Sequence, residues 1–201
     1  MEISIEQVKN LRQRTGAGII DCKTALQEAK GDIDGAIEYL RRKGLATAAK
    51  KAGRIAADGL VASYIHAGGK MGVLVEINCE TDFVAKTEDF QTFVKNVAMQ
   101  IAAANPQYIR REDIPADVLE RERRIYRSQA LEAGKPEKVI DKIVEGKMER
   151  FYSEVCLLEQ TFIKDSDLTV KEVLDAMIAK IGENIAIRRF ARFQLGEGLQ
   201  S

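Results

Sequence analysis

The chain has 201 residues and a hydrophobic content of 45%, which is ample for a packed core and argues against a disordered protein. Lysine plus arginine and aspartate plus glutamate both total 31, so the formal net charge is zero. No overall field then draws the chain toward phosphate polymers or acidic membranes, which argues against a general nucleic-acid coat protein.

Neither a targeting signal nor a membrane span is evident. The first ten residues, MEISIEQVKN, lack the apolar stretch of a secretory signal, and no later run approaches the roughly 20 apolar residues of a spanning helix. We therefore expect a mature start near Met1. Three cysteines, Cys22, Cys79 and Cys156, lie far apart without a CxxC pair, which argues against a zinc site and against secreted-type disulfides. We expect a cytoplasmic protein with no metal and no cofactor.

Residues 1–45 predict three short helices separated by glycines. Ser4 followed by Gln7 is a capping-box pattern that opens the first helix, which ends at the TGAG break. Apolar residues then recur at helical spacing in two further runs, one ending at Gly31 and the other at Gly44. The sequence therefore predicts a small helical module.

Residues 46–58 are rich in alanine and carry Lys50, Lys51 and Arg54. This composition favours a helix but supplies few large apolar side chains, so we expect a helical linker. A basic patch here could contact nucleic acid. In a chain without net charge, however, such a run more commonly forms a solvated face.

A hairpin is predicted next. Leu60–His66 alternates, two glycines follow, and Met71–Asn78 places Val73, Val75 and Ile77 on one face. His66 ends the first of these strands. Because no second type of ligand clusters near it, we expect an ordinary strand-end residue and not a metal ligand.

Beyond the hairpin the period becomes helical. Five apolar residues fall on one stripe, which predicts one helix after a junction at Cys79–Asp82; they are Phe83, Phe90, Val94, Val97 and Ile101. Pro115 and Gly134 frame a second helix, and Pro136 opens a third with a wide apolar face meant for burial.

An extended piece is plausible at Thr161–Ile163, and Thr169 with Glu172 forms a capping box for a helix that ends before Gly182. The order of helices, hairpin, helices and a last strand predicts an α+β fold. We expect a helical module followed, in residues 59–201, by a core with a small antiparallel sheet packed by helices.

The last strand is Ile185–Leu195, where two sets of side chains alternate. Phe193 shares a face with Ile187 and Leu195, and Phe190 lies on the opposite face. The pattern therefore predicts that Phe193 packs in the core.

Four separated stretches resemble one family. They are LRQRTGAGIIDCK at 11–23, NCETDFVA at 78–85, EGKMERFYSEVCLLEQ at 145–160, and KIGENIAIRR at 180–189. In this order they resemble translation elongation factor Ts over nearly the whole chain. The resemblance implies that residues 1–45 form a module of the ubiquitin-associated type and that residues 59–201 form the core and dimerisation domain.

The resemblance also implies a function. Elongation factor Ts is the guanine-nucleotide exchange factor that releases GDP from elongation factor Tu, so the expected partner is that GTPase, GDP-bound or nucleotide-free. An Asp-Phe pair in the family intrudes near the magnesium site of the partner and matches Asp82 and Phe83 here. Thr81 and Val84 are expected to belong to the same contact. Spacing alone favours a plainer meaning, in which Asp82 complements a helix dipole and Phe83 begins the apolar stripe.

One phenylalanine is not sufficient for such an exchange. Burying it contributes about 1.5 to 3 kcal/mol, whereas turning a closed population into an open one needs about 5.5 kcal/mol. We therefore expect further contacts through Arg12, Ile19 and Ile20 on the helical module.

The sequence departs from the family in three places. The KIGEN and RR stretch occurs once, at the end of the chain, whereas many members carry a duplicated core. The chain therefore resembles the short form that works as a homodimer. Ile19-Ile20 stands where Met-Met is expected and Lys147 where Arg is expected, and both changes keep the character of the side chain.

Two other classes of function compete. An RNA-binding module of the translation apparatus would use Lys50, Lys51 and Arg54 with the arginines of the last strand, although zero net charge argues against it. An enzyme would need a nucleophile, a base and an orienting group. Ser63 and His66 form the only nearby pair, and residues three apart on a strand point to opposite faces. We expect no catalytic residues.

Overall fold

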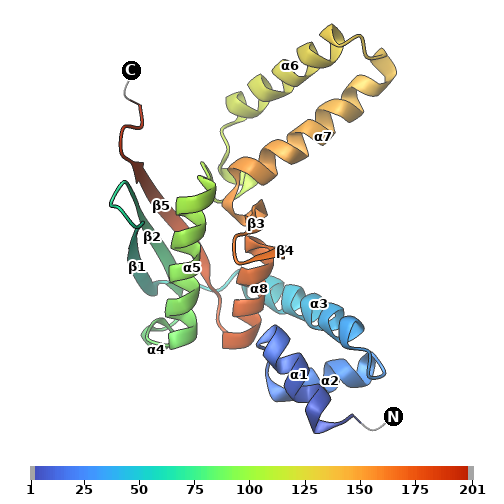
Figure 1. Cartoon of the computed structure of the whole chain (residues 1–201), viewed down its shortest axis with the longest axis vertical. Helices are drawn as coiled ribbons and strands as arrows, with labels where there is room; N and C mark the ends of the chain where they lie inside the picture. The colour runs from blue at the N-terminus through green and yellow to red at the C-terminus, as the bar shows by residue number, and fades with distance from the viewer. Residues whose placement is uncertain (1–2, 199–201) are drawn as a thin grey trace. The chain divides into compact units, whose positions relative to one another are not determined.

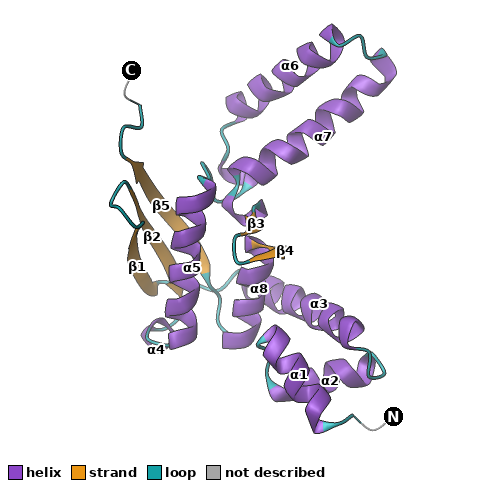
Figure 2. Cartoon of the chain, viewed as in Figure 1, coloured by secondary structure: helices purple, strands orange, loops and turns teal. Residues whose placement is uncertain are grey.

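The computed structural model describes residues 3–198, and its elements are labelled in Figure 1 and coloured by type in Figure 2. Its helices are α1 (Ile5–Thr15), α2 (Ile19–Glu28), α3 (Ile33–Lys51), α4 (Asp82–Ala85), α5 (Glu88–Ala104), α6 (Ala116–Glu132), α7 (Glu137–Val155) and α8 (Val170–Ile181). Its strands are β1 (Asp58–Ile65), β2 (Met71–Cys79), β3 (Thr161–Phe162), β4 (Asp165–Thr169) and β5 (Ala186–Gln194), and its 3₁₀ helices are η1 (Arg111–Asp113) and η2 (Leu157–Glu159). The α+β prediction is confirmed. The expected start near Met1 lies outside the described residues.

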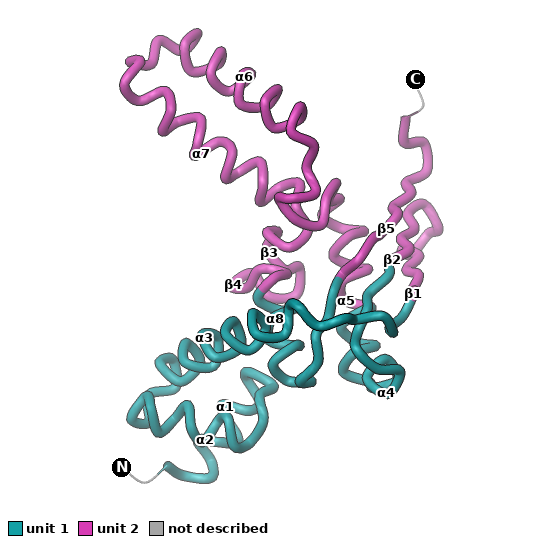
Figure 3. The backbone as a smooth tube through the Cα atoms, turned by 180° about the vertical axis from the view of Figure 1, so that it is seen from behind, with its two compact units in different colours: residues 1–60, 76–94, 172–186 teal, residues 61–75, 95–171, 187–201 magenta. Residues whose placement is uncertain are grey.

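The chain divides into two compact units (Figure 3). Unit 1 comprises residues 1–60, 76–94 and 172–186, and unit 2 comprises residues 61–75, 95–171 and 187–201. Each unit therefore joins segments that lie far apart in the sequence. Within the described range, 3–198, no helix combines the length and the apolar content that a membrane crossing needs.

Three helices open unit 1, as predicted. The Ser4 hydroxyl accepts from the Gln7 amide at 3.1 Å and the Gln7 side chain accepts from the Ser4 amide at 3.0 Å, so the expected capping box opens α1. Fully buried side chains form the core of the module: Leu11, Cys22, Ala25, Leu26 and Ala36. Burying these apolar groups fixes α1, α2 and α3 against one another.

Helix α3 does not end at Gly44, and that part of the prediction is wrong. It continues to Lys51. Gly44 is buried, and a Cβ there would lie 3.9 Å from the Ala179 Cβ and 3.9 Å from the Asp175 carbonyl oxygen, both on α8. The glycine therefore allows two helices to approach closely, which offsets its poor helix propensity.

The sheet has the strand order β1-β2-β5, and the predicted hairpin β1–β2 is present. The His66 amide closes it by donating to the Met71 carbonyl at 2.9 Å. Val73, Val75 and Ile77 are buried on the predicted face of β2.

The burial of β5 differs from the prediction. Ile187 is buried, but Phe193 is 68% exposed and does not pack in the core. The inward position belongs instead to Arg192, whose Nε donates to the Ala102 carbonyl near the end of α5 at 3.3 Å. Carbonyls in the last turn of a helix lack helical partners, so a cation is favoured there.

Two antiparallel helices, α6 and α7, form a helical hairpin in unit 2. Both begin after a proline, as predicted, and the turn between them uses Gly134 at φ 67°. Buried side chains of α7 pack against Ile114 and Ala130; they are Ile140, Val144, Met148 and Tyr152.

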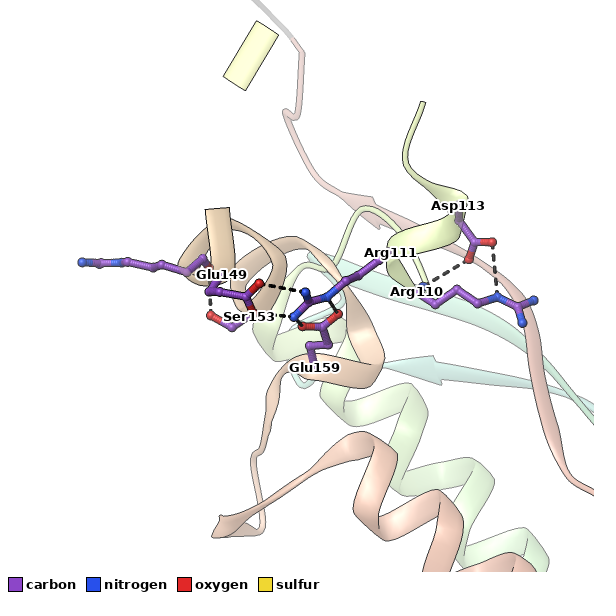
Figure 4. Close-up of polar contacts among 7 residues, drawn as sticks. Arg110, Arg111, Asp113, Glu149, Ser153 and Glu159 are labelled. Carbon is purple, nitrogen blue, oxygen red and sulfur yellow. Dashed lines mark hydrogen bonds and ion pairs between the residues drawn. The ribbon is translucent and has the colours of Figure 1, made fainter. Parts of the chain in front are cut away.

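Arg111 joins three segments at the base of this hairpin. Its guanidinium bonds the Glu149 carboxylate at 2.9 and 2.7 Å and also pairs with Glu159 (Figure 4). It lies 4.2 Å above the Tyr152 ring. The hydrogen bonds to Glu159 and then Glu149 raise the pKa of Arg111 above its usual value, so the cation is retained at every ordinary pH.

Candidate functional site

The Asp82-Phe83 pair lies where β2 gives way to α4, and residues 80–84 are here named the corner. Thr81 is the N-cap of α4, with extended backbone at φ −132° and ψ 152°, and its hydroxyl accepts from the Val84 amide at 3.4 Å. β2 is anchored just before the corner by buried Ile77 and Cys79. The predicted strand-to-helix junction at Cys79–Asp82 is therefore confirmed.

Phe83 projects from the corner and does not belong to the apolar stripe. It is 76% exposed, whereas Phe90, Val94, Val97 and Ile101 are buried on α5 as predicted. The predicted single helix is wrong because the chain turns between α4 and α5. The Thr87 hydroxyl donates to the Val84 carbonyl at 2.8 Å and accepts from the Phe90 amide at 3.3 Å. This turn resets the helical phase, so Phe83 faces solvent.

Asp82 is also exposed, and it carries a negative charge with a local counterion. Lys86 donates to its carboxylate at 2.6 Å, one helical turn along the chain. This hydrogen bond, followed by the charge of Lys86, holds the pKa of Asp82 below its usual value. Asp82 is therefore an ionised acceptor at neutral pH, next to an exposed aromatic ring.

The backbone of the corner is held by Glu183, which follows the end of α8. One carboxylate oxygen of Glu183 accepts from the amides of Glu80 and Thr81 at 3.0 and 3.1 Å. The other oxygen accepts from the Thr81 hydroxyl at 2.7 Å. Thr81 therefore bonds within the chain, while Val84 is buried at 6% exposure.

A second contact runs in the reverse direction. The Glu80 carboxylate accepts from the Asn184 amide at 2.6 Å, and the Asn184 side chain donates to the Arg54 carbonyl at 2.8 Å. The Lys51 ammonium bonds the Gly182 carbonyl. The end of α3 with the residues after it, the corner, and the segment after α8 are thus joined in one hydrogen-bond network of unit 1, which we name the brace. Its members are Lys51, Arg54, Glu80, Thr81, Gly182, Glu183 and Asn184.

Comparison with known proteins decides the family. The family model described as Elongation factor TS matches residues 46–197. The chain belongs to the elongation factor Ts family. Curated relatives named Elongation factor Ts include that of Carboxydothermus hydrogenoformans, which is 66% identical over 98% of this chain and 91% of the relative. Those of Caldanaerobacter subterraneus and Geobacter sulfurreducens are 65% and 62% identical, over 98% and 100% of this chain and 99% and 93% of the relatives. The resemblance is confirmed, and the chain has a role as a translation elongation factor.

The residues predicted on the helical module lie at its surface. Ile19 and Ile20, at the start of α2, are 59% and 81% exposed. Arg12 lines a hollow of about 570 Å³, together with Lys9, Gln13, Gly16, Asp89 and Lys180. Lys180 donates to Asp89 at 2.7 Å. The surface of unit 1 in this chain thus carries two neighbouring exposed isoleucines and a hollow lined by three cationic side chains, Lys9, Arg12 and Lys180.

Glu183 and Asn184 were not predicted as site residues. They lie in the KIGEN stretch that carries part of the family resemblance, but a sequence gives no indication that a carboxylate 102 residues from Thr81 will bond to it. The signal available was the ending of a helix before Gly182, followed at once by polar residues ahead of a strand. Such a loop needs partners for its backbone.

The described residues include the single histidine and the three cysteines of the chain. Within residues 3–198, no group of three or more His, Cys, Asp or Glu side chains could hold a metal ion. His66 Nδ1 lies 3.0 Å from the Tyr64 hydroxyl, in a local contact along the end of β1. Cys22, Cys79 and Cys156 are buried and free.

Proposed function

We propose that this chain is a guanine-nucleotide exchange factor for elongation factor Tu. It binds the GDP-bound and nucleotide-free forms of that GTPase in the cytoplasm, disturbs its magnesium and phosphate site, and lets GTP load during translation elongation. The observation that carries the proposal is Phe83, a 76% exposed aromatic ring on a braced corner. An aromatic ring held at the surface in this way is available to be buried against another protein, where aromatic side chains contribute much of the contact energy.

The chemistry follows from how GTPases hold magnesium. The ion requires near-ideal octahedral oxygen geometry, so small displacements of its ligands weaken it sharply. Phe83 enters between partner side chains near the nucleotide and shifts them, and ionised Asp82 accepts from donors that would otherwise hold the ion and the phosphates. The chain supplies no catalytic side chain and no cofactor, because the displaced groups belong to the partner.

Binding energy from the rest of the surface supports this displacement. Coupling between two ligands is reciprocal, so the factor weakens GDP as much as GDP weakens the factor. One buried aromatic side chain contributes about 1.5 to 3 kcal/mol, which is less than the coupling a complete opening needs. Arg12, Ile19 and Ile20 supply further contacts on the helical module, where both isoleucines are exposed.

The direct test is the rate of GDP release. Elongation factor Tu is loaded with fluorescent GDP, and its release is followed by stopped flow with wild type, Phe83→Ala and Leu131→Ala. Leu131 is a matched control because it is 55% exposed and lies on α6. We expect Phe83→Ala alone to slow release. If wild type leaves the release rate of elongation factor Tu unchanged, the proposed function is wrong.

We also propose that the chain acts as a homodimer through one face of its sheet. Some apolar side chains of unit 2 are exposed because they alternate with the buried residues of β2 or the half-buried residues of β1, or because they lie near the end of β5: Val61, Ile65, Leu74, Phe193 and Leu195. Removing this apolar sheet face from water lowers the free energy, and a second copy of the chain offers an identical surface to cover it. Light scattering should give twice the 22.4 kDa of one chain for wild type, and a lower mass for Phe193→Glu.

The RNA-binding alternative has less support in the structure. Several of the cations that it needs already have partners within the chain. Arg192 bonds Ala102 and Gln194. Lys51 bonds Gly182, and Arg54 lies 3.6 Å from Glu80. A cation paired in this way releases fewer counterions from a phosphate backbone. An RNA affinity that falls steeply with salt would favour the alternative.

A further inference from the structure

The Glu183 carboxylate is the acceptor that fixes the conformation of the corner. The chain leaves β2 at Cys79, and the next two amides, of Glu80 and Thr81, both donate to Glu183. A third donor, the Thr81 hydroxyl, lies 2.7 Å from the same carboxylate. Hydrogen bonds to an ionised acceptor are about twice as strong as neutral ones. One side chain therefore restrains two consecutive residues directly before Asp82 and Phe83.

The restraint is reinforced from the opposite side. Asn184, the next residue, donates its amide to the Glu80 carboxylate at 2.6 Å and is itself buried at 8% exposure. The two segments 80–81 and 183–184 are thus cross-bonded in both directions. Lys51, the last residue of α3, and Arg54 just after it bond the same loop through the Gly182 carbonyl and the Asn184 side chain. All of these contacts lie within unit 1.

We propose that Glu183 is a positioning residue for nucleotide exchange, which acts through Phe83 without touching the partner; this inference rests on the proposed exchange function. Phe83 must displace groups in another protein, and it displaces them less when its own backbone is free to move. Restraining that backbone in the free factor removes the cost of ordering it on binding. Thr81 belongs to the same restraint, since its hydroxyl bonds Glu183 and caps α4.

The experiment compares Glu183→Ala, Glu183→Gln, Phe83→Ala and the double variant Glu183→Ala with Phe83→Ala, in the stopped-flow GDP-release assay. Glu120→Gln, an exposed carboxylate on α6, is the matched control. We expect Glu183→Ala to slow release about tenfold, as the loss of charge-assisted bonds to a loop predicts. Glutamine keeps one oxygen for the two amides, so Glu183→Gln should restore most of the rate.

The double variant separates positioning from general stability. If Glu183 acts through Phe83, removing Glu183 has no further effect once Phe83 is alanine. GDP release from elongation factor Tu should then be equally fast with the double variant and with Phe83→Ala alone. If the fold-reductions of the two single variants multiply in the double variant, the proposal is overturned. A Glu183→Ala protein with the wild-type rate would overturn it as well. Should Glu183→Ala fail to fold, Thr81→Val, which replaces the hydroxyl by a methyl group of similar size, takes its place with the same expected non-additivity.

Amide hydrogen exchange in the free protein gives an independent measurement. Exchange at the Glu80 and Thr81 amides should accelerate at least about tenfold in Glu183→Ala and stay near the wild-type rate in Phe83→Ala. Unchanged exchange at both amides would overturn the restraint itself. A wild-type chain that does not accelerate GDP release from elongation factor Tu would instead overturn the proposed function, and the amide exchange would still decide the restraint by itself.

Discussion

Gly59 lies directly against the backbone of Ile77. A Cβ at Gly59 would stand 2.2 Å from the Ile77 carbonyl oxygen and 2.7 Å from the Asn78 Cα, and the φ angle of Gly59 is +138°. Neither the space nor the backbone angle accepts any side chain. This contact lies beside the end of β2, two to three residues before the corner.

The first prediction is that Gly59→Ala destabilises the protein by about 2 kcal/mol or more, because strain at a glycine-only angle adds to a backbone clash. Urea unfolding monitored by circular dichroism measures the change. The control is Gly53→Ala, since a Cβ at Gly53 meets nothing within 4 Å. Its unfolding free energy should stay within about 0.5 kcal/mol of wild type. Equal effects for the two variants would contradict the argument.

The second prediction concerns the stability that Arg111 contributes at the base of the α6–α7 hairpin. A lysine cannot bond two carboxylates as a planar guanidinium does, so Arg111→Lys should lose part of its contacts to Glu149 and Glu159. Because the side chain of Arg111 is 40% exposed, solvent screening limits the expected loss to about 1 kcal/mol of unfolding free energy.

Arg110→Lys is the control for that measurement. Arg110 is the neighbour of Arg111, and its side chain meets one carboxylate, Asp113, at 3.3 Å (Figure 4). An exposed pair of this kind contributes between about 0 and 1 kcal/mol, so Arg110→Lys should be close to neutral. The two variants are compared by urea unfolding at low and high salt. A larger loss for Arg110→Lys than for Arg111→Lys would contradict the role given to Arg111.

Local sequence patterns predicted most helices and strands. They failed where a contact with a residue far away in the sequence determines the end of a helix or the burial of a side chain. The capping box at Ser4, the hairpin and the proline-started helices follow from neighbours in the sequence. Gly44 does not end α3, because its absent side chain lets α8 approach. Phe193 is exposed because Arg192 takes the inward position to reach α5. Both outcomes depend on which segments meet, and the period of the sequence does not contain that information.

The candidate site was predicted in part for the same reason. Asp82 and Phe83 were identified from a family motif, and the exposure of Phe83 agrees with a role at the surface. Helical spacing alone placed Phe83 in the stripe with Phe90, because it could not foresee the turn at Thr87. Glu183 was missed since its bond to the Thr81 backbone has no sequence signature.

The third prediction concerns the thiols. Burial, followed by the charges of Glu183 and Asp58, raises the pKa of Cys79 from 9.0 to about 11. The thiolate is the reactive form, so Cys79 should react slowly with a disulfide reagent at neutral pH and should not form a disulfide across subunits in the folded protein. Ellman's reagent should label all three cysteines quickly only after unfolding. Rapid labelling of Cys79 in the native state would contradict the prediction.

The same shift has a consequence for stability. The folded state binds the Cys79 proton more tightly than the unfolded state, so between pH 9 and about pH 11 the folded protein holds more protons. The stabilising contribution is complete below pH 9 and is lost as the pH rises through about 11. Replacing Cys79 with alanine should therefore flatten part of the fall in unfolding free energy over that interval.

The last prediction tests the helical module. Ile20 is 81% exposed in the free chain, and covering such a side chain contributes about 1.5 to 3 kcal/mol. If the module contacts elongation factor Tu through Ile20, Ile20→Ser should weaken binding about 10- to 100-fold. It should leave the unfolding free energy nearly unchanged, because the residue packs against nothing in its own core. Titration calorimetry with nucleotide-free elongation factor Tu measures the affinity.

Ile5 provides the matched control, because it is 77% exposed on α1 of the same module and has no role in the proposed contact. Ile5→Ser removes the same apolar surface, so any general effect of a more polar module should appear in both variants. A loss of affinity confined to Ile20→Ser assigns the contact to the start of α2. Equal losses, or none in Ile20→Ser, would place the contact of the module elsewhere and remove Ile20 from it.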